Sequence, residues 1–552
     1  MKIALLQVNT VVGDLTGNAD LIAAGVEEAA HSRPDLIVTP ELSLTGCPPR
    51  DLLLGRGFVE RSLEVMEDLA ADLEDAPPVI VGFAAQDRAG PGRPLLNAAA
   101  LLRDGAVRET FGKTHLSPSG ALDEGHYFEP AAGAPRVLLL AGRRVGVPTR
   151  RSSDLSIGEE IWCGGRSAGE LVSAGAEVIV NIAASPFAVG RQGLREEALA
   201  CTARDHRVVI AVANLVGGND DLVFDGRSSV FSADGTLIAR GAAFAEDIVT
   251  VDLDRPGPQA VAPDDLAPES EIWQALVLGT RDYVRKSGFE TALLGLSGGI
   301  DSSLVAAVAA RALGPENVLG VLLPSPYTSP ESIEDAREVA ENLGIRTCCL
   351  PIAPAMEAFD GILAEVFAGL PRDTTEENLQ ARIRAVVLMA LANKFDSMLL
   401  STGNKSEAAV GYSTLYGDMA GGLAVIGDVS KGMVYRISRW LNRERPVIPD
   451  RVLEKPPSAE LRPGQTDQEV LPPYDLLDAI LHRHIDCFES PGDIIAAGYP
   501  AETVHRVLRM VRLAEFKRRQ AAPGIRVTGR AFGADWRMTI TARPWWQEDV
   551  CR

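Results

Sequence analysis

The chain has 552 residues with a formal net charge of −21, and 46% of its residues are hydrophobic. This length exceeds what one hydrophobic core usually holds, so we expect at least two domains. With 23% charged residues, 52 glycines and 35 prolines, the composition is that of a globular chain. An acidic surface repels phosphate backbones and anionic lipids, which argues against nucleic acid and membranes as partners.

The cysteines and the first residues bear on the cellular compartment. Seven cysteines without a C-x-x-C spacing predict neither a disulfide framework nor a zinc ribbon. Residues 1–8 lead directly into a strand-like stretch without the pattern of a signal peptide, and no apolar run reaches about 18 residues. We therefore expect a cytoplasmic protein.

The first half of the chain alternates short β-branched runs with helical stretches. Apolar, β-branched runs predict strands, and apolar residues at helical spacing predict helices. The dipeptide Asp234-Gly235 adds an antiparallel hairpin signal. Together they predict a layered α/β domain with a mixed-sheet sandwich over residues 1–253. The expected strands are 2–8, 35–40, 78–83, 177–182 and 207–216, and the expected helices are 21–30, 59–73 and 193–204.

Residues 254–270 interrupt this pattern, and a second series of elements follows. The sequence DRPGPQAVAPDDLAPES is rich in proline and acidic residues, which disfavour both helix and strand, so we interpret it as a linker. A helix over 271–286 and strands over 291–296, 318–323 and 347–351 then predict a βαβαβ unit. Such a unit forms a parallel sheet with a ligand crevice at the carboxyl ends of its strands. The second domain is expected over 271–552.

A glycine-rich turn follows the first strand of this second domain. Its sequence, SGGIDSS over 297–303, opens a helix. Glycines let backbone N–H groups point outward and the helix N-terminus adds positive potential, so the turn can bind a pyrophosphate. The turn lacks the lysine and spacing of a Walker A loop. Taken alone, it could equally be structural, but Asp301 in its first helical turn and Glu407 after a second polar turn are suited to Mg²⁺ beside phosphates.

Several segments in one order resemble the NAD synthetase family. The resemblance covers about 271–542 and rests on LSGGIDSSL (296–304), LPSPYTSPESIEDA (323–336), TEENLQARIR (375–384), STGNKSE (401–407), GYSTLYGDMAGG (411–422), KPPSAELRPGQTD (455–467) and EFKRRQAAPG (515–524). It implies a parallel-sheet ATP-pyrophosphatase domain of the adenine nucleotide alpha hydrolase-like type. It also implies that ATP adenylates the carboxylate of deamido-NAD, after which ammonia displaces AMP to give NAD.

The resemblance also implies roles for individual residues. Thr402 would contact ATP, and the metal Mg²⁺ would be held by Asp301 and Glu407. Deamido-NAD would meet Asn378, Glu407 and Lys517, although Lys517 could instead belong to a solvated basic helix face. The loop for the ATP phosphates would comprise Gly295, Leu296, Ser297, Gly298, Gly299, Ile300, Asp301 and Ser302.

The first domain resembles the nitrilase or carbon-nitrogen hydrolase superfamily, an αββα sandwich that is fused to NAD synthetases in their glutamine-dependent form. The resemblance assigns the general base to Glu41 and oxyanion stabilisation to Lys113. An anionic transition state at an amide carbonyl requires such a cation. Outside this context Glu41 would be interpreted as a surface acid at a strand end. The expected glutamine pocket contains Ser119, Ser185 and Arg191, of which Ser119 and Arg191 depart from the common family residues.

The position of the nucleophile departs from the family pattern. The family has a cysteine there, whereas this chain has Gly158, which cannot form a thioester. Eight residues, 148–155 (PTRRSSDL), precede it, and their deletion restores the register VGVSIGEEIW. They are either a true insertion, which must bulge out of the strand, or an error in the sequence. We expect the chain as written to use ammonia and to hydrolyse glutamine poorly or not at all.

Other functions remain as alternatives at this point. A different ATP pyrophosphatase, such as a GMP-synthetase-like or tRNA-thiolating enzyme, would share the loop. Thiolation would need separated reactive cysteines, whereas Cys348 and Cys349 are adjacent on a strand predicted to be buried. The remaining alternatives are an ammonia-only NAD synthetase with an inactive amidase domain and a noncatalytic nucleotide-binding protein. The resemblance further implies a homo-oligomer.

Overall fold

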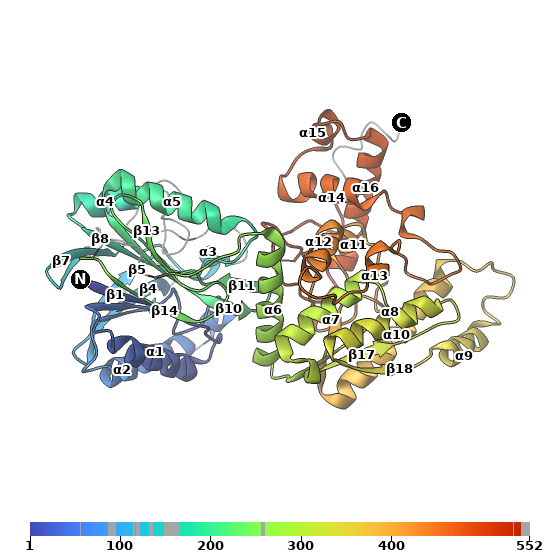
Figure 1. Cartoon of the computed structure of the whole chain (residues 1–552), viewed down its shortest axis with the longest axis horizontal. Coiled ribbons are helices and arrows are strands. Elements are labelled where there is room, and N and C mark those ends of the chain that lie inside the picture. The colour runs from blue at the N-terminus through green and yellow to red at the C-terminus, as the bar shows by residue number, and fades with distance from the viewer. Residues whose placement is uncertain are drawn as a thin grey trace. The chain divides into compact units, whose positions relative to one another are not determined.

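The computed structural model describes residues 1–55, 57–86, 95–113, 116, 122–131, 136–147, 166–255, 260–533 and 535–542 (Figure 1). Its backbone divides into two compact units, Met1–Leu266 and Ala267–Arg552. Within the described ranges, none of the helices combines the length and the apolarity needed to cross a bilayer.

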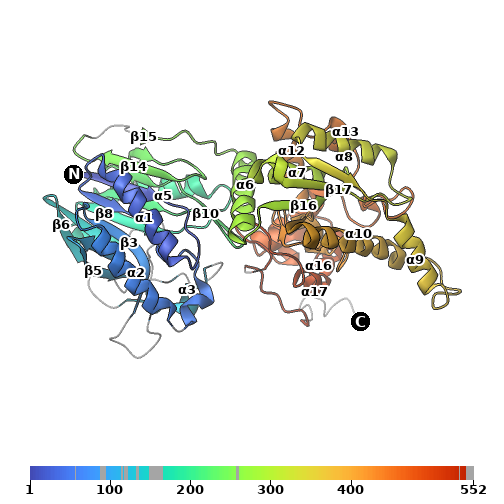
Figure 2. The same ribbon diagram turned by 90° about the horizontal axis from the view of Figure 1, so that it is seen from below.

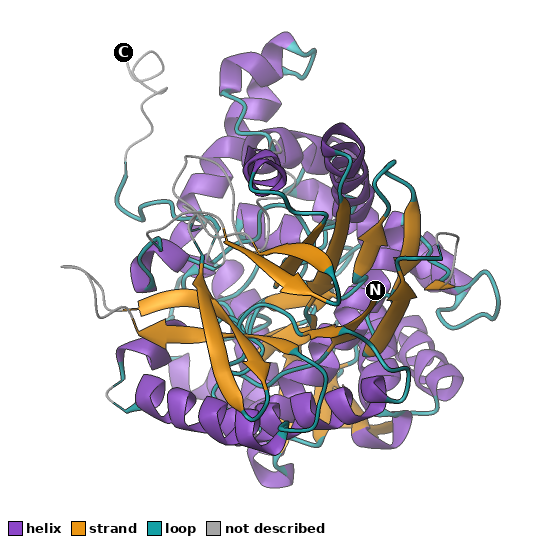
Figure 3. Ribbon diagram, turned by 90° about the vertical axis from the view of Figure 1, so that its left-hand side faces the viewer, coloured by secondary structure: helices purple, strands orange, loops and turns teal. Residues whose placement is uncertain are grey.

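Two sheets form the centre of the first unit (Figure 3). The six-stranded sheet has the order β14 (Asp247–Asp252), β1 (Lys2–Gln7), β2 (Leu36–Val38), β3 (Val79–Gln86), β4 (Leu95–Arg103), β5 (Ala106–Gly112). The seven-stranded sheet has the order β15 (Ala260–Val261), β13 (Leu237–Arg240), β12 (Ser229–Phe231), β9 (Val209–Asn214), β8 (Val178–Ala183), β7 (Arg143–Val147), β6 (Arg136–Leu140). A hairpin of β10 (Val216–Asn219) and β11 (Leu222–Asp225) is separate from both.

Alternating side chains along each central strand build the layers of this unit. In β8, Val178, Val180 and Ile182 join the core between the sheets. Ile179 and Ala183 of the same strand face the opposite way, toward a helix layer. Successive strand residues point to opposite faces, so a fully apolar strand must be covered on both sides. The predicted αββα sandwich is confirmed. The helices of this unit are α1 (Leu15–Ala30), η1 (Arg50–Leu54), α2 (Phe58–Asp72), α3 (Glu124–Tyr127), α4 (Arg166–Ser173) and α5 (Arg191–His206).

The second unit contains a five-stranded sheet whose strands are all parallel. Their order is β18 (Arg346–Cys349), β17 (Val318–Leu322), β16 (Thr291–Gly295), β19 (Ser397–Ser401), β20 (Leu423–Ala424). Chain order runs outward from β16 in one direction and then returns to β19 on its other side, which is a topological switch point. Ligands of such sheets bind at the carboxyl ends of the strands beside this point. The predicted parallel-sheet domain is confirmed.

Helices accompany this sheet, and a helical region follows it (Figure 2). Those within the sheet region are α6 (Pro268–Lys286), α7 (Ile300–Leu313), η3 (Pro315–Asn317), α8 (Pro330–Leu343), α9 (Ala353–Leu363), α10 (Thr374–Phe395), α11 (Lys405–Val410) and α12 (Lys431–Leu441). Those that follow are α13 (Asp450–Glu454), η4 (Asp467–Glu469), α14 (Tyr474–Leu481), the π-helical turn η5 (His482–Asp486), α15 (Pro491–Ala496), α16 (Ala501–Leu513) and α17 (Glu515–Arg518). Helix α7, which follows the glycine-rich turn, is buried along most of its length, so it fixes that turn against the core.

Three local expectations differ from the structure. The linker contains the short strand β15, which pairs in parallel with β13, and α6 begins at Pro268, three residues before the predicted start. Proline is favoured in the first helical turn because its missing N–H needs no partner there. The prediction that Cys348 and Cys349 lie on a buried strand is wrong: β18 is at the sheet edge, Cys348 is half-buried and Cys349 is exposed.

Gly82 in β3 allows the loop after β2 to cross the sheet closely. A Cβ atom at this position would lie 2.3 Å from the carbonyl oxygen of Pro40 and 2.6 Å from the amide nitrogen of Leu42. Both contacts are to backbone atoms, which cannot rotate away. The glycine therefore determines where the intervening Glu41 lies.

We predict that Gly82→Ala lowers the free energy of unfolding by about 1–3 kcal/mol, because the added methyl group overpacks the site. Gly193→Ala is the matched control, since that helical glycine has open space around its Cβ position. The control should be neutral or slightly stabilising. Urea denaturation of the full chain measures both, and equal stabilities for the two variants would contradict the prediction.

Candidate functional site

In the first unit, one lysine holds two buried glutamates. Lys113 follows β5, Glu41 follows β2, and Glu124 begins α3. Lys113 Nζ lies 2.7 Å from Glu41 Oε1 and 2.8 Å from Glu124 Oε1, and all three side chains are almost fully buried. The sequence therefore brings Glu41 and Lys113 together as predicted, with Glu124 as an additional member.

Neighbouring groups hold Glu41 in one orientation. Asn97 Nδ2 on β4 donates to Glu41 Oε1 at 2.7 Å, and the backbone N–H of Ala184 donates to Glu41 Oε2 at 3.0 Å. Burial raises the pKa of Glu41 to about 7, against the opposing effect of Lys113. Glu124 and Glu41 raise the pKa of Lys113 above its ordinary value despite burial, so this ammonium group stays charged. The result is a fixed cation next to a base that titrates near neutrality.

The predicted glutamine-pocket residues are only partly described. Ser185 follows β8 beside Ala184, and its backbone N–H donates to Asn214 Oδ1 at 3.0 Å. Its Oγ atom is buried without a hydrogen-bond partner in the described part of the chain, which leaves the hydroxyl available to a ligand. Arg191 begins α5 and is half-buried. Ser119 and Gly158, as well as residues 148–155, lie outside the described residues.

In the second unit, the glycine-rich turn connects β16 to α7. Gly298 has a φ of 80°, and a Cβ atom there would lie 2.1 Å from the carbonyl oxygen of Ser332 on α8. Ser297 Oγ accepts from the N–H of Gly299 at 3.2 Å and lies 3.0 Å from Ser302 Oγ. Glycine is therefore required for the turn to approach α8, and the serine hydroxyls keep its conformation fixed.

Asp301 and Glu407 converge on one ammonium group. Lys431, at the start of α12, forms an ion pair with Asp301 and lies 3.3 Å, Nζ to Oε1, from Glu407. Asn404 caps α11 by accepting from the N–H of Glu407, and its Nδ2 donates to Asp301 Oδ1 at 3.0 Å. The two acids predicted to share a site do so, across 106 residues of chain and on opposite sides of the switch point.

This acidic pair is short of positive charge. Burial raises the pKa of Glu407 to about 8, with Lys431 lowering it and Asp301 raising it further. Asp301 and Glu407 raise the pKa of Lys431, so one positive charge faces two carboxylates. Mg²⁺ is commonly bound through one or two carboxylates together with phosphate oxygens, and the oxygen donors present fit such an ion. In the described residues, no group of three or more His, Cys, Asp or Glu side chains forms a protein-only metal site.

The three residues predicted to meet deamido-NAD surround the segment after α11. Asn378 Oδ1 on α10 accepts from Thr414 Oγ1 at 2.7 Å. Lys517 Nζ on α17 donates to the carbonyl oxygens of Gly411 and Ser413 at 2.7 and 2.6 Å. Glu407 precedes this segment by one helical turn. Lys517 is thus bound to backbone, and the alternative of a solvated helix face does not describe it.

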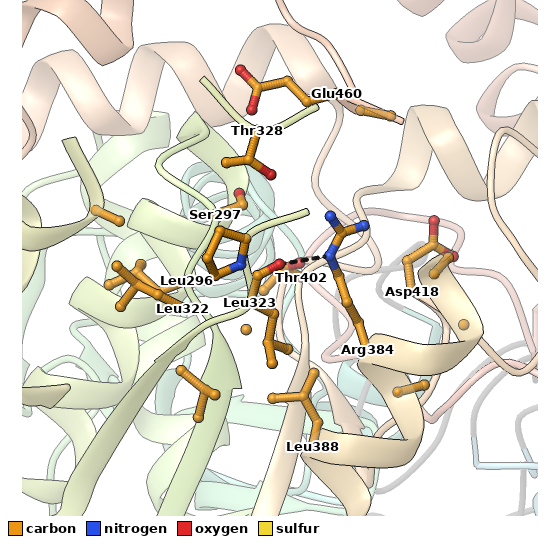
Figure 4. Close-up of a pocket in the computed structure, with 18 of the residues that line it drawn as sticks. Leu296, Ser297, Leu322, Leu323, Thr328, Arg384, Leu388, Thr402, Asp418 and Glu460 are labelled. Carbon is orange, nitrogen blue, oxygen red and sulfur yellow. Dashed lines mark hydrogen bonds between the residues drawn. The ribbon is translucent and has the colours of Figure 1, made fainter. Parts of the chain in front are cut away.

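A pocket opens at the carboxyl ends of β16, β17 and β19 (Figure 4). Its volume is about 270 Å³, and its walls include Gly295, Leu296 and Ser297 of the loop and Thr402 after β19. Apolar side chains, chiefly leucine and alanine, make up most of the remaining wall. The polar exceptions are Ser332, Arg384, Asp418, Ser458 and Glu460, with Thr328 and Ser401. An apolar chamber that opens onto an anion-binding turn is suited to a nucleotide.

Sequence reasoning missed the residues that complete these sites. Glu124 and Lys431 join them from segments that carry no motif of their own, whereas Arg384 ends the matching segment TEENLQARIR but was given no role there. Lys431 had a weak signal, because it follows a small polar turn and begins an amphipathic helix. Glu124 had none, since an acid in a short helix is an ordinary surface residue. For Arg384 the signal was its place in the matching segment 375–384.

Comparison with known proteins identifies relatives of both units. A family model of carbon-nitrogen hydrolases matches residues 2–262, and a model of NAD synthases matches residues 272–521. Glutamine-dependent NAD(+) synthetases are 45% identical in Synechocystis sp., over 98% of both chains, and 44% identical in Thermotoga maritima, over 98% of this chain and 99% of that protein. The glutamine-dependent NAD+ synthetase of Acinetobacter baumannii, solved with ADP, superposes with a TM-score of 0.77 at 38% identity and 98% coverage of both chains. The chain therefore belongs to the family of glutamine-dependent NAD synthetases.

Proposed function

We propose that this chain catalyses the ATP-dependent amidation of deamido-NAD to NAD, with release of AMP and pyrophosphate. The observation that carries the proposal is the juxtaposition of the glycine-rich turn with the Asp301–Lys431–Glu407 cluster at the switch point of the parallel sheet. Family membership supports the same reaction. The enzyme is a carbon-nitrogen ligase in NAD biosynthesis.

ATP binds along the pocket and the turn. The adenosine occupies the apolar chamber, Thr402 contacts the nucleotide, and the amides of residues 295–302 receive the phosphates. The amides at the start of α7 and the helix dipole both favour negative charge there. Pyrophosphate can therefore leave without a protein nucleophile, because positioning and charge neutralisation perform the catalysis.

Deamido-NAD is held by Asn378, Glu407 and Lys517. Its nicotinate carboxylate attacks the α-phosphorus of ATP, the bond to the bridging oxygen breaks, and pyrophosphate departs with the electron pair. Ammonia then attacks the acyl carbon of the adenylate and AMP leaves. The ammonium group of Lys431 reduces repulsion between the two anionic substrates and the acidic pair.

Mg²⁺ fits the acidic pair, and Asp301 and Glu407 would hold it. A bound Mg²⁺ neutralises phosphate charge and orients the leaving pyrophosphate. A carboxyl group must lose its proton before it can be a ligand.

We predict that the affinity for Mg²⁺ rises as the pH increases toward about 8, because Glu407 then ionises, and levels off above that pH. Titration calorimetry with Mg²⁺ at pH 6.5, 7.5 and 8.5 measures this, and each unit below the pKa should cost roughly tenfold in affinity. Glu407→Gln should bind more weakly and lose this pH dependence. A wild-type affinity that does not change with pH would contradict the assignment.

In the first unit, Glu41 acts as the general base and Lys113 stabilises the oxyanion, with Glu124 and Asn97 holding both in position. The named relatives use glutamine, which supports glutamine as the nitrogen donor of the family. Gly158 removes the nucleophile from this chain. What remains of the site can bind and polarise an amide but cannot form the thioester.

We predict that the chain as written forms NAD from ammonium, and that its rate with glutamine is lower by at least ~10³-fold. Product formation from ATP, deamido-NAD and each nitrogen donor measures this. A variant that combines Gly158→Cys with deletion of residues 148–155 should regain glutamine use, and Glu41→Gln in that background should lose it again. Equal rates with ammonium and glutamine in the original chain would refute the prediction, whereas no NAD from either donor would refute the proposed reaction.

We further propose a cytoplasmic homo-oligomer. ATP and dinucleotide substrates are present in the cytoplasm. Apolar side chains lie exposed on α9 and just beyond it, including Ile362, Val366 and Leu370, and Val386 on α10 is equally exposed. Helix α9 has no buried residue. Clusters of this kind usually mark a protein interface.

We predict that Ile362→Glu combined with Val366→Glu reduces the oligomer to a smaller species, because two charges enter an apolar contact. Sedimentation velocity measures the mass in solution. Leu139→Glu is the matched control, since that leucine is 70% exposed and belongs to the first unit. If the oligomer keeps its mass after the double substitution, this surface is not the interface between subunits.

A further inference from the structure

Arg384 supplies a cation to the wall of the nucleotide pocket. It lies on α10, and its Nε donates to the carbonyl oxygen of Leu323 at 3.0 Å (Figure 4). Among the described residues that line the pocket, it is the one lysine or arginine. The Leu323 contact fixes the plane of the guanidinium and leaves its two terminal nitrogens able to donate to a ligand.

The acids in the same wall are already engaged elsewhere. Glu460 accepts from Lys455 Nζ at 2.8 Å and from Ser332 Oγ at 2.7 Å. Asp418 accepts from the N–H of Thr414 at 2.7 Å. Within the described ranges, no carboxylate forms an ion pair with Arg384. Burial lowers the pKa of Arg384 to about 10, and the negative charge of Glu460 opposes this shift only in part.

A half-buried guanidinium without a carboxylate partner is costly unless an anion joins it. Arginine is well suited to phosphate because its fork of donors matches two phosphate oxygens. The pocket thus offers a second anion position, beside Arg384. The inference rests on the proposed placement of ATP in this pocket.

The order of groups in ATP indicates which phosphate this is. The adenine requires the apolar chamber, and the leaving β- and γ-phosphates require the amides of the glycine-rich turn. Leu296 and Ser297 of that turn line the same pocket as Arg384. The phosphate between chamber and turn is the α-phosphate. We propose that Arg384 binds the α-phosphate of ATP and stabilises the charge that develops there when the carboxylate of deamido-NAD attacks.

In this step a carboxylate oxygen forms a bond to the α-phosphorus, and the bond from that phosphorus to the bridging oxygen breaks. Arg384 keeps its protons and donates hydrogen bonds to the non-bridging oxygens throughout. It stabilises the transition state more than the bound ATP, because charge on those oxygens increases as the new bond forms.

Calorimetric binding of adenosine, AMP and ATP to the full chain separates the possible contacts. Arg384→Gln should weaken AMP and ATP about 10- to 100-fold, the effect expected for a charged hydrogen bond, and leave adenosine within twofold. Arg384→Lys should recover part of the affinity. Arg311→Gln, at an exposed position on α7, is the matched control and should change none of the three.

Three results would overturn the inference. Loss of ATP affinity with unchanged AMP affinity would show that Arg384 contacts the β- or γ-phosphate. Equal weakening of adenosine would show a structural role in the chamber. Unchanged affinity for all three nucleotides would show no contact. Failure of the unaltered chain to bind ATP would instead refute the proposed function together with this inference.

A kinetic measurement tests the catalytic part. Exchange of labelled pyrophosphate into ATP, dependent on deamido-NAD, reports the adenylation step without any nitrogen donor. Arg384→Gln should lower kcat of this exchange about 100-fold or more, beyond its effect on KM for ATP, because the stabilised charge appears in the transition state. A change confined to KM would exclude the catalytic role.

Discussion

Both units depend on one arrangement of buried charge, in which a single ammonium group lies between two carboxylates. In the first unit Lys113 joins Glu41 and Glu124, and in the second Lys431 joins Asp301 and Glu407. One positive charge cannot neutralise two negative ones in a medium of low dielectric constant, so one acid in each site holds its proton more tightly than usual. The pKa is about 7 for Glu41 and about 8 for Glu407.

The two sites use this shortage of positive charge differently. In the first unit the acid with the raised pKa becomes a base that can take and return a proton near neutral pH. In the second unit, under the proposed function, the unsatisfied negative charge would favour a divalent cation and, through it, phosphate groups. The same arrangement of charge is therefore suited to proton transfer in the first unit and to metal binding in the second, because the neighbouring groups differ.

Much of the fold could be predicted from the sequence, because it follows from local patterns. The apolar runs of β1, β8 and β9 and the strand-turn-helix around Gly298 were each visible within a short window. The pairing of Asp301 with Glu407 also followed, since both acids come after parallel strands whose ends meet. The motifs also predicted that Asn378 and Lys517 share a site, and both contact the segment after α11.

What could not be predicted was set by contacts between distant segments. Lys431 contacts Asp301 from 130 residues away, and the polar turn before it gives only a weak indication of that contact. Strand β18 contains two cysteines, a residue type that is usually buried, but it lies at the sheet edge. The sequence therefore predicted more burial than the strand has. Whether a strand lies at the edge or in the centre depends on the strand order of the whole sheet. A short stretch of sequence does not contain that information.

Helix α10 carries residues assigned to both substrates and an exposed apolar residue. Over 22 residues, roughly 33 Å of continuous helix, it carries Asn378, which we assign to the dinucleotide, Arg384 in the pocket wall and the exposed Val386. An α-helix transmits displacement along its axis as a stiff rod. In the proposed oligomer, a subunit that contacts the outer face of α10 would therefore move both proposed substrate contacts together, which would couple assembly to the alignment of the two reactants.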